Sequence, residues 1–221
     1  MLEGNLMELK GKLIGFATLV EHMIQKSTKG LREKKHDLLV EVVEQDEPKA
    51  NKLELELDEL CTSLIAQFEP KAKDLRIILM ISKMSNDLER MGDHAVNIAE
   101  SGLFLIEHPQ VKPLIDIPRM AEITIKMLQD STDSFIKEDA VLAKDVCERD
   151  NDVDDLKDHI LRELITFMSS DPSTIERSLH LIRISNNLER IADLSTNICE
   201  GILFMTEGRV IKHHQEDGKT E

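Results

Sequence analysis

The chain is poor in aromatic residues: among its 221 residues are six Phe, no Trp and no Tyr. Hydrophobic residues make up 41% of the chain and charged residues 32%. This mixture of Leu, Ile, Met, Glu and Lys is typical of an all-helical protein, and it argues against a β-sandwich or an α/β enzyme. The length suits one large domain or two small ones, each with a hydrophobic core of its own.

Cysteines and long apolar segments are also scarce. Cys61, Cys147 and Cys199 are far apart in the sequence and lie within apolar helical patterns, so they indicate reduced core residues rather than a disulfide framework or a zinc site. The longest apolar runs, "IILMI" and "ILFM", are too short to span a bilayer. The N-terminal "MLEGNLMELKGKLIGF" carries acids and lysines where a signal peptide is apolar. We therefore expect a soluble, cytoplasmic protein that does not span a membrane.

Positive charge is the third deficit, because the formal net charge is −15. Such a chain is not expected to bind DNA or RNA through phosphate contacts. Its acidity is compatible with a partner that has a basic surface, or with bound cations. Solubility alone would explain the acidity as well.

An internal repeat decides the expected architecture. Residues 22–46 match residues 126–150 at a constant offset of 104, and residues 79–104 match 179–204 at an offset of 100, with 12 of 26 positions identical. A duplicated unit of roughly a hundred residues explains both matches. We place the first unit at 1–107, a Pro-rich connector at 108–118, the second unit at 119–208 and a C-terminal tail at 209–221.

Within each unit, helix breakers separate three stretches with helical apolar spacing. We expect Gly30 to interrupt the first stretch, Pro48 to start the second and Pro70 to separate the second from the third, while Pro172 does the same in the second unit. No stretch alternates like a strand. The sequence predicts an elongated, all-α protein of six helices, arranged as two tandem homologous three-helix bundles.

The last helix of each unit carries a column of acidic and amide side chains. In "NDLERMGDHAVNIAE" (86–100), Glu89, Asp93 and Asn97 recur every four residues, and the counterparts in 186–200 are Glu189, Asp193 and Asn197. Each column lies nearly opposite the apolar face of its helix. A solvated helix face explains such a column, but it normally interleaves lysine with acids at i,i+4. A repulsive column present in both units indicates that a cation supplies the missing charge.

A second acidic element lies near the start of each middle helix. The second unit has Asp150 and Asp154 at i,i+4, and the first has Asp46 or Glu47 followed by Asn51. Helix capping explains one or two of these acids but not their spacing. If the middle and last helices pack side by side, the two elements converge on one ion. Their oxygen ligands suit hard cations such as Mg²⁺, Ca²⁺, Mn²⁺ or ferric iron.

At these residues the chain resembles the PhoU family, accessory proteins of the phosphate-specific transport system. The resemblance rests on "DLERMGD…NIAE", "NLERIAD…NICE", "QFEPKAKDLR", "RELITFM" and the Pro-rich connector. It implies a homodimer of two-bundle chains that binds metal (Fe, Mn, Mg, Ca or Zn) and restrains phosphate uptake and the phosphate-starvation response when phosphate is plentiful. The implied partners are the ATPase subunit of the phosphate transporter and the phosphate-sensing histidine kinase.

The resemblance also assigns metal ligands. It implies this role for Glu89 and Asp93, for Glu189 and Asp193, and for Asp150 and Asp154. The first unit departs from the family pattern, since "DEPKAN" has one extra residue and Asn51 stands where an acid is also common. The choice between Asp46 and Glu47 therefore stays open, and we expect the first-unit site to bind metal less tightly.

Two alternatives belong to other classes. A ferritin-like di-iron carboxylate enzyme would need Glu-x-x-His pairs on facing helices, but the third residue after Glu89 is Gly92 and after Glu189 is Ala192. A metal-free helical adaptor would use the acidic columns only as a docking surface. We expect a protein that is not an enzyme.

Overall fold

The computed structural model describes residues 2–207, which form helices and turns without a strand. The predicted tail lies outside this range. The elements are α1 (Leu2–Glu33), α2 (His36–Glu41), a π-helical turn η1 (Val42–Asp46), α3 (Glu47–Phe68), α4 (Lys73–Ile106), α5 (Asp116–Lys137), α6 (Ala140–Ser170), a 3₁₀ turn η2 (Pro172–Thr174) and α7 (Ile175–Glu207). Because α2, η1 and α3 follow one another without a break, residues 2–207 form six long helical segments. The all-α prediction is confirmed.

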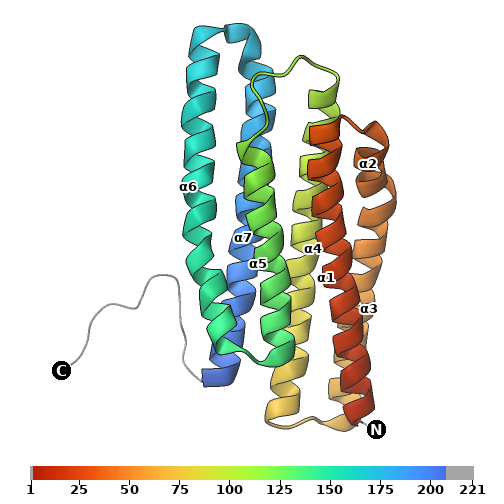
Figure 1. Ribbon diagram of the computed structural model, residues 1–221. Coiled ribbons are helices and arrows are strands. Elements are labelled where there is room, and N and C mark those ends of the chain that lie inside the picture. Colours follow the sequence, from red (N-terminus) through yellow and green to blue (C-terminus); the bar gives the residue numbers. More distant parts are fainter. Residues whose placement is uncertain (1, 208–221) are drawn as a thin grey trace, which may run out of the picture.

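The six segments run up and down the long axis of the molecule in two groups of three (Figure 1). The first unit packs α1, α3 and α4 together, and the second packs α5, α6 and α7. The units adjoin along two helix pairs, α4 with α7 and α1 with α5. Within residues 2–207, α3 contacts no element of the second unit and α6 contacts none of the first. The molecule therefore has a central bundle of four helices, α1, α4, α5 and α7, with α3 packed outside it in the first unit and α6 in the second.

The two units bury equivalent positions of their last helices. Leu88 and Ile98 of α4 are fully buried, as are Leu188 and Ile198 of α7. Residues 81–92 and 181–192 have the same burial class at every position. The apolar faces of both segments, which follow the 3.6-residue helical period, are therefore buried in the same way, as the repeat predicts.

Gly30 does not interrupt the first helix, contrary to the sequence-based expectation, because α1 runs through it to Glu33. A Cβ atom at Gly30 would lie 2.6 Å from Cδ2 of Leu39. Glycine is therefore needed here for the close approach of α2, not for a break. Pro118 also lies within a helix, in the first turn of α5, where its missing N–H is not required.

The extra residue of the first unit lies in the π-helical turn η1. Val42 and Val146 are equivalent buried residues at an offset of 104, whereas Ala50 and Val153 are equivalent buried residues at an offset of 103. A single inserted residue is accommodated in a helix by one wider i→i+5 turn. The residues before and after Val42–Asp46 consequently keep the same face toward the core.

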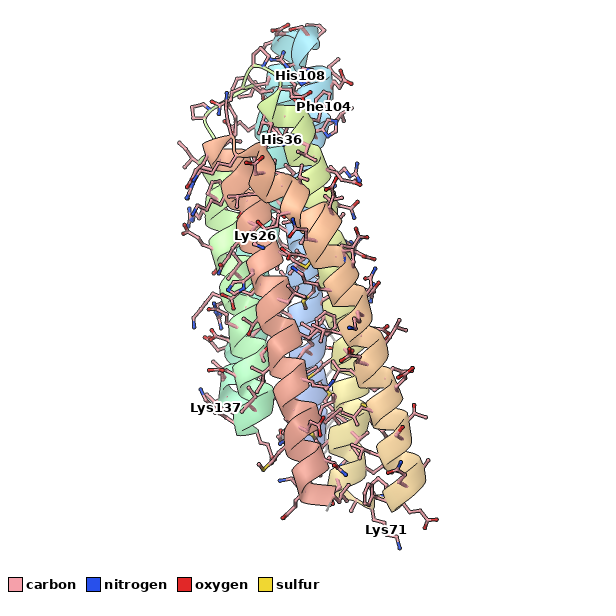
Figure 2. The ribbon with its side chains drawn as sticks, turned by 90° about the vertical axis from the view of Figure 1, so that its right-hand side faces the viewer. Lys26, His36, Lys71, Phe104, His108 and Lys137 are labelled. Carbon is pink, nitrogen blue, oxygen red and sulfur yellow. The ribbon has the colours of Figure 1, made fainter. Side chains whose placement is uncertain are left out.

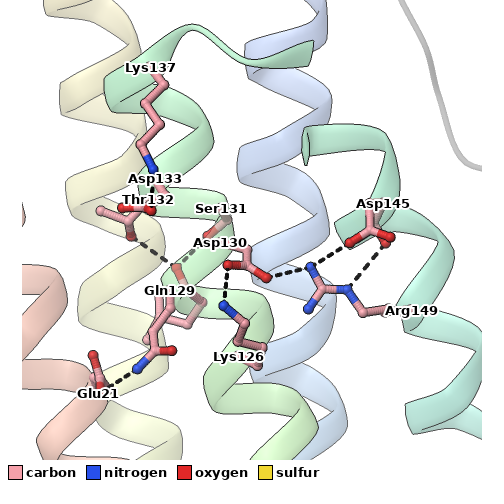
Figure 3. A network of polar contacts seen from close by, with 11 residues as sticks. Glu21, Lys126, Gln129, Asp130, Ser131, Thr132, Asp133, Lys137, Asp145 and Arg149 are labelled. Carbon is pink, nitrogen blue, oxygen red and sulfur yellow. Dashed lines mark hydrogen bonds and ion pairs between the residues drawn. The ribbon is translucent and has the colours of Figure 1, made fainter. Parts of the chain in front are cut away.

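The contact between the units is close and partly polar. A Cβ atom at Gly201 of α7 would lie 2.8 Å from Cε of Met80 on α4. The amide of Gln129 on α5 donates to Glu21 on α1 at 2.7 Å (Figure 3). Beside it, Asp130 of α5 accepts from Arg149 of α6 at 2.7 Å. Polar contacts thus link α1 to α5 and α5 to α6.

No helix in the described range combines the length and the apolarity that a bilayer crossing requires.

Candidate metal centre

Each acidic column faces the outer helix of its own unit. In the first unit α3 packs against α4, and in the second α6 packs against α7. The middle and last helices of each unit therefore pack side by side, as the predicted convergence of the two acidic elements requires. What each pair brings together differs between the units.

In the first unit, the charges of three carboxylates act on a fourth. Glu89 is partly buried, and its pKa is raised by loss of solvent and by the charges of Asp93, Glu54 and Glu47, against the opposing effect of Arg90. Among residues 2–207, no lysine or arginine forms an ion pair with any of these four carboxylates. We call Glu47, Glu54, Glu89 and Asp93 the first-unit cluster.

Asp46, the alternative to Glu47, points elsewhere. Its carboxylate accepts from Lys26 at 2.6 Å and from Lys49 at 3.0 Å, and the residue is 1% exposed. Lys26, which lies on α1 (Figure 2), also donates to Glu41 of α2 at 2.6 Å. The π turn places Asp46 on the inner face, and Glu47 is the residue directed toward the column. Geometry thus favours Glu47 over Asp46.

The amide side chains join the columns less directly. Asn51 is exposed one turn after Glu47. Asn97 accepts a hydrogen bond from Arg183 of α7 at 2.7 Å, and Arg183 also contacts Glu100 at 3.3 Å. Asn97 therefore takes part in the contact between the units. Asn197 is half-buried one turn beyond Asp193.

The second unit has the same acids with cations among them. Lys157 of α6 lies 3.0 Å from Glu189 and 3.5 Å from Asp154, while Arg190 lies 3.2 Å from Asp193. Burial raises the pKa of Asp193, and the charges of Glu189 and Asp154 raise it further while Arg190 opposes them. We call Asp154, Glu189 and Asp193 the second-unit cluster.

Asp150 lies one turn before Asp154 on α6, half-buried. Its charge acts on the thiol of Cys147, which is in hydrogen-bonding contact with Cys199 of α7. Two cysteines that are distant in the sequence are therefore neighbours in the second unit. All three cysteines are free thiols.

Sequence reasoning missed Glu54 and Lys157, although both were visible in the repeat. Glu54 lies seven residues after Glu47, on the same face of α3. The 103-residue offset that relates Ala50 to Val153 also relates Glu54 to Lys157. Aligning the middle helices across the extra residue would have paired them.

A third group of possible ligands was also missed. One ligand atom each from Asp116, His159 and Glu163 lies within 4.8 Å of the others. Lys112, which is 7% exposed, donates to both Asp116 and Glu163. The ammonium group already supplies the positive charge, and it fastens the connector to α5 and α6.

A ring stack marks the end of the molecule near the connector. Phe104 stacks on His108 and on His180 of α7, each at 4.1 Å between ring centroids, and Figure 2 shows Phe104 and His108 at this end. His94, lower on α4, lies 2.8 Å from the side-chain oxygen of Asn187. These histidines make contacts within the fold.

The donor sets differ in how well they suit a metal. The first-unit cluster offers only carboxylate oxygens, with Asn51 nearby, which matches the preference of hard cations. Burial raises the pKa of Glu89 most and the neighbouring negative charges raise it further, and such a cation would relieve the repulsion among those charges. The second-unit cluster offers similar oxygens but holds the ammonium of Lys157 among them.

Known proteins share both the sequence pattern and the architecture of this chain. The family model described as "PhoU domain" matches twice, at residues 13–102 and 117–202. The "Phosphate-specific transport system accessory protein PhoU homolog" of Aquifex aeolicus is 41% identical over 97% of this chain and 96% of its own length. The "Phosphate-specific transport system accessory protein PhoU" of Escherichia coli (strain K12) is 31% identical over 93% and 85%.

Solved structures agree with these matches. The crystal structure of PhoU from Pseudomonas aeruginosa superposes with a TM-score of 0.91 at 32% identity, covering 95% of this chain and all of that one. The phosphate transport system regulatory protein PhoU from Streptococcus pneumoniae gives 0.87 at 25% identity, covering 96% and 100%. The two matched repeats, the relatives along nearly the full length and the shared fold establish that this chain belongs to the PhoU family.

Proposed function

We propose that this protein is a metal-binding negative regulator of phosphate uptake and of the phosphate-starvation response. The observation that carries the regulatory role is its similarity, over nearly the full length of both chains, to relatives named accessory proteins of the phosphate-specific transport system. The metal-binding part rests on the first-unit cluster, whose carboxylates repel one another without an ion-paired lysine or arginine in the described range.

The proposed partners are the ATPase subunit of the phosphate transporter and the phosphate-sensing histidine kinase, with the protein acting in the cytoplasm as a homodimer. A bound cation would offset part of the negative charge of a column. The carboxylates would hold the cation, and the cation would supply a positive centre able to bind a carboxylate or phosphate oxygen of a partner. Binding to the partners is therefore proposed to depend on the metal.

A regulator fits the residues better than a ferritin-like enzyme. The positions that a di-iron site would fill with histidine are Gly92 and Ala192, and both are buried against the core. A Cβ atom at Gly92 would already contact Ala50 and Met23 at 3.7 Å. An imidazole at this position would enter the core instead of the column.

Deleting the gene and measuring alkaline phosphatase at high phosphate tests the regulatory role. We expect constitutive phosphatase in the deletion strain and restored repression when the wild-type gene is returned. Repression that is unchanged by the deletion would contradict the regulatory proposal. The oligomeric state is tested separately by light scattering of the purified protein, where a monomer at micromolar concentration would exclude the dimer.

Elemental analysis and thermal unfolding test metal binding. We expect Fe, Mn, Mg, Ca or Zn after gentle purification, and a lower melting temperature after chelation, because an ion bound only to the native state stabilises it by mass action. The Glu89→Ala/Asp93→Ala double variant should lose both metal and chelator sensitivity. The matched control is Asp58→Ala/Glu59→Ala, which removes two exposed acids of α3. Equal metal content in the two double variants would refute the assignment.

A further inference from the structure

Between the two clusters, one aligned position reverses the sign of its charge. Ala50 and Val153 are equivalent buried residues, and they define which residues of α3 and α6 correspond in the repeat. In this register Glu47 corresponds to Asp150 and Asn51 to Asp154. The next position on the same face is Glu54 in the first unit and Lys157 in the second. A negative and a positive side chain therefore stand at the same place beside the last helix.

In the second unit, Lys157 occupies the place where a cation would bind. Its ammonium lies 3.0 Å from Oε1 of Glu189 and 3.5 Å from Oδ1 of Asp154, so it bridges α7 and α6. The side chain of Glu189 is only 14% exposed, which limits the access of water to this pair. Arg190 pairs with Asp193 from the solvent side. Each of the three carboxylates is within ion-pair distance of a cationic side chain.

In the first unit, Glu54 adds a fourth carboxylate instead of a cation. Its charge acts on Glu89 together with those of Asp93 and Glu47. The nearby Arg90 is directed toward Asp87, at 3.8 Å. Within residues 2–207, no ion pair balances the negative charge of this group.

We infer that the first-unit cluster is the stronger metal site of this chain, and that Lys157 acts as a built-in cation in the second unit, where a metal ion binds only by displacing it. This inference rests on the proposed metal binding, and it reverses the order of affinity expected from the sequence. A divalent ion beside an ammonium group is repelled by it. Entry into the second-unit cluster also breaks the two contacts of Lys157.

A reciprocal exchange of these two side chains is the test. Metal-stripped protein is titrated with Mn²⁺ alone, and the bound ions are counted by calorimetry and by the loss of the free Mn²⁺ signal in electron paramagnetic resonance. Glu54→Lys should weaken the tighter binding at least about tenfold, since it places a positive charge within a few ångströms of the ion. Lys157→Glu should add a second class of tight binding.

Matched controls separate local from net charge. Glu59→Lys matches Glu54→Lys in charge change but lies at an exposed position of α3. Lys71→Glu matches Lys157→Glu, and it lies in the loop before α4, at the opposite end of the molecule from His108 (Figure 2). Neither control should alter affinity or stoichiometry by more than about twofold. Helical circular dichroism verifies that each variant folds. If Lys157→Glu does not fold, Glu54→Lys against Glu59→Lys decides the question.

The outcomes distinguish this inference from the proposed function. Tight binding that is lost with Glu54→Lys and gained with Lys157→Glu supports the inference. Tight binding that is equal in the two units, or unchanged by Glu54→Lys, overturns it and leaves metal binding intact. A wild-type chain that binds no Mn²⁺, Mg²⁺ or Fe at all overturns both the metal part of the proposed function and this inference, while the regulatory test remains separate.

Discussion

The first and second units have the same helices and the same buried positions, but they balance their acidic columns in different ways. In the first unit a π-helical turn directs Asp46 to two lysines and leaves Glu47 and Glu54 beside Glu89. In the second unit α6 continues without a π turn, and Lys157 lies between Glu189 and Asp154. The duplicated backbone thus places the acidic columns at equivalent positions, while single side chains of the outer helix determine whether a cationic side chain balances their charge.

The largest expected effect comes from deleting one matched residue in each unit. Deleting Glu148 rotates the rest of α6 by about 100° and turns Val153, Ile160 and Leu164 away from the core. We expect this to cost more than about 4 kcal/mol, since each lost core side chain costs about 2–5 kcal/mol. Deleting Glu44 removes the extra residue of η1 and keeps the later residues in register, at a cost below about 2 kcal/mol.

Chemical denaturation followed by circular dichroism measures both deletions. The two glutamates correspond in the repeat and both are exposed, so the loss of the side chain itself is matched. Similar destabilisation by the two deletions would mean that η1 is not the place of the extra residue.

A smaller effect of opposite sign is expected when the central glutamates are neutralised in metal-free protein. Glu89→Gln removes repulsion from Asp93 and its neighbours, and should stabilise the fold by about 0.5 kcal/mol. Glu189→Gln removes a partner of Lys157, and should destabilise it by about 1 kcal/mol. Urea unfolding with a chelator present measures both. Changes of the same sign would show that the columns are electrostatically alike.

The gain from Glu89→Gln should also depend on pH. The pKa of Glu89 is raised in the folded state above its ordinary value of 4.5, first by burial and then by the neighbouring negative charges, so folding favours the protonated form. The penalty of the ionised form is present above the folded pKa and is relieved as the pH falls through it toward 4.5. The difference between wild type and Glu89→Gln should thus be largest near pH 7 and shrink on acidification. A difference that grows on acidification would contradict this.

An effect of similar size is expected where the two last helices already differ by one methyl group. Gly92→Ala should stabilise the fold by about 0.5–1 kcal/mol, because alanine is the better helix former and the new Cβ atom would make ordinary contacts at 3.7 Å. Ala192→Gly should have the opposite effect, by about 1 kcal/mol. The melting temperatures of the two variants provide the measurement, and destabilisation by Gly92→Ala would mean that α3 and α4 are packed more tightly than the distances indicate.

The fold was predictable because its determinants are periodic. Helical apolar spacing, the repeat and the proline positions were enough to predict two three-helix bundles, and the same spacing places Leu88 and Leu188 in the core. Gly30 was misjudged, because a glycine can serve either as a helix breaker or as a contact point. The nearness of Leu39 decides between the two, and that contact is tertiary.

The candidate site was only partly predictable, because charge balance depends on neighbours from another helix. Glu89, Asp93, Glu189 and Asp193 were found from their spacing within one helix. The roles of Glu54 and Lys157 depend on the register between outer and last helices, which a one-residue insertion obscures. Asn97 was expected in the column, and its contact with Arg183 across the two units follows only from the packing of α4 against α7.

The position of α3 and α6 outside the central four-helix bundle bears on the order in which the helices unfold locally. Each outer helix is held by its own unit alone, whereas the inner helices are held from both sides. Cooperative units that open first are those with the fewest contacts to the rest of the fold. Backbone amides of α3 and α6 should therefore exchange with solvent earlier than those of α4 and α7. An ion or an ammonium group that bridges an outer helix and a last helix would consequently slow the local opening of the outer helix, which is the first segment expected to detach.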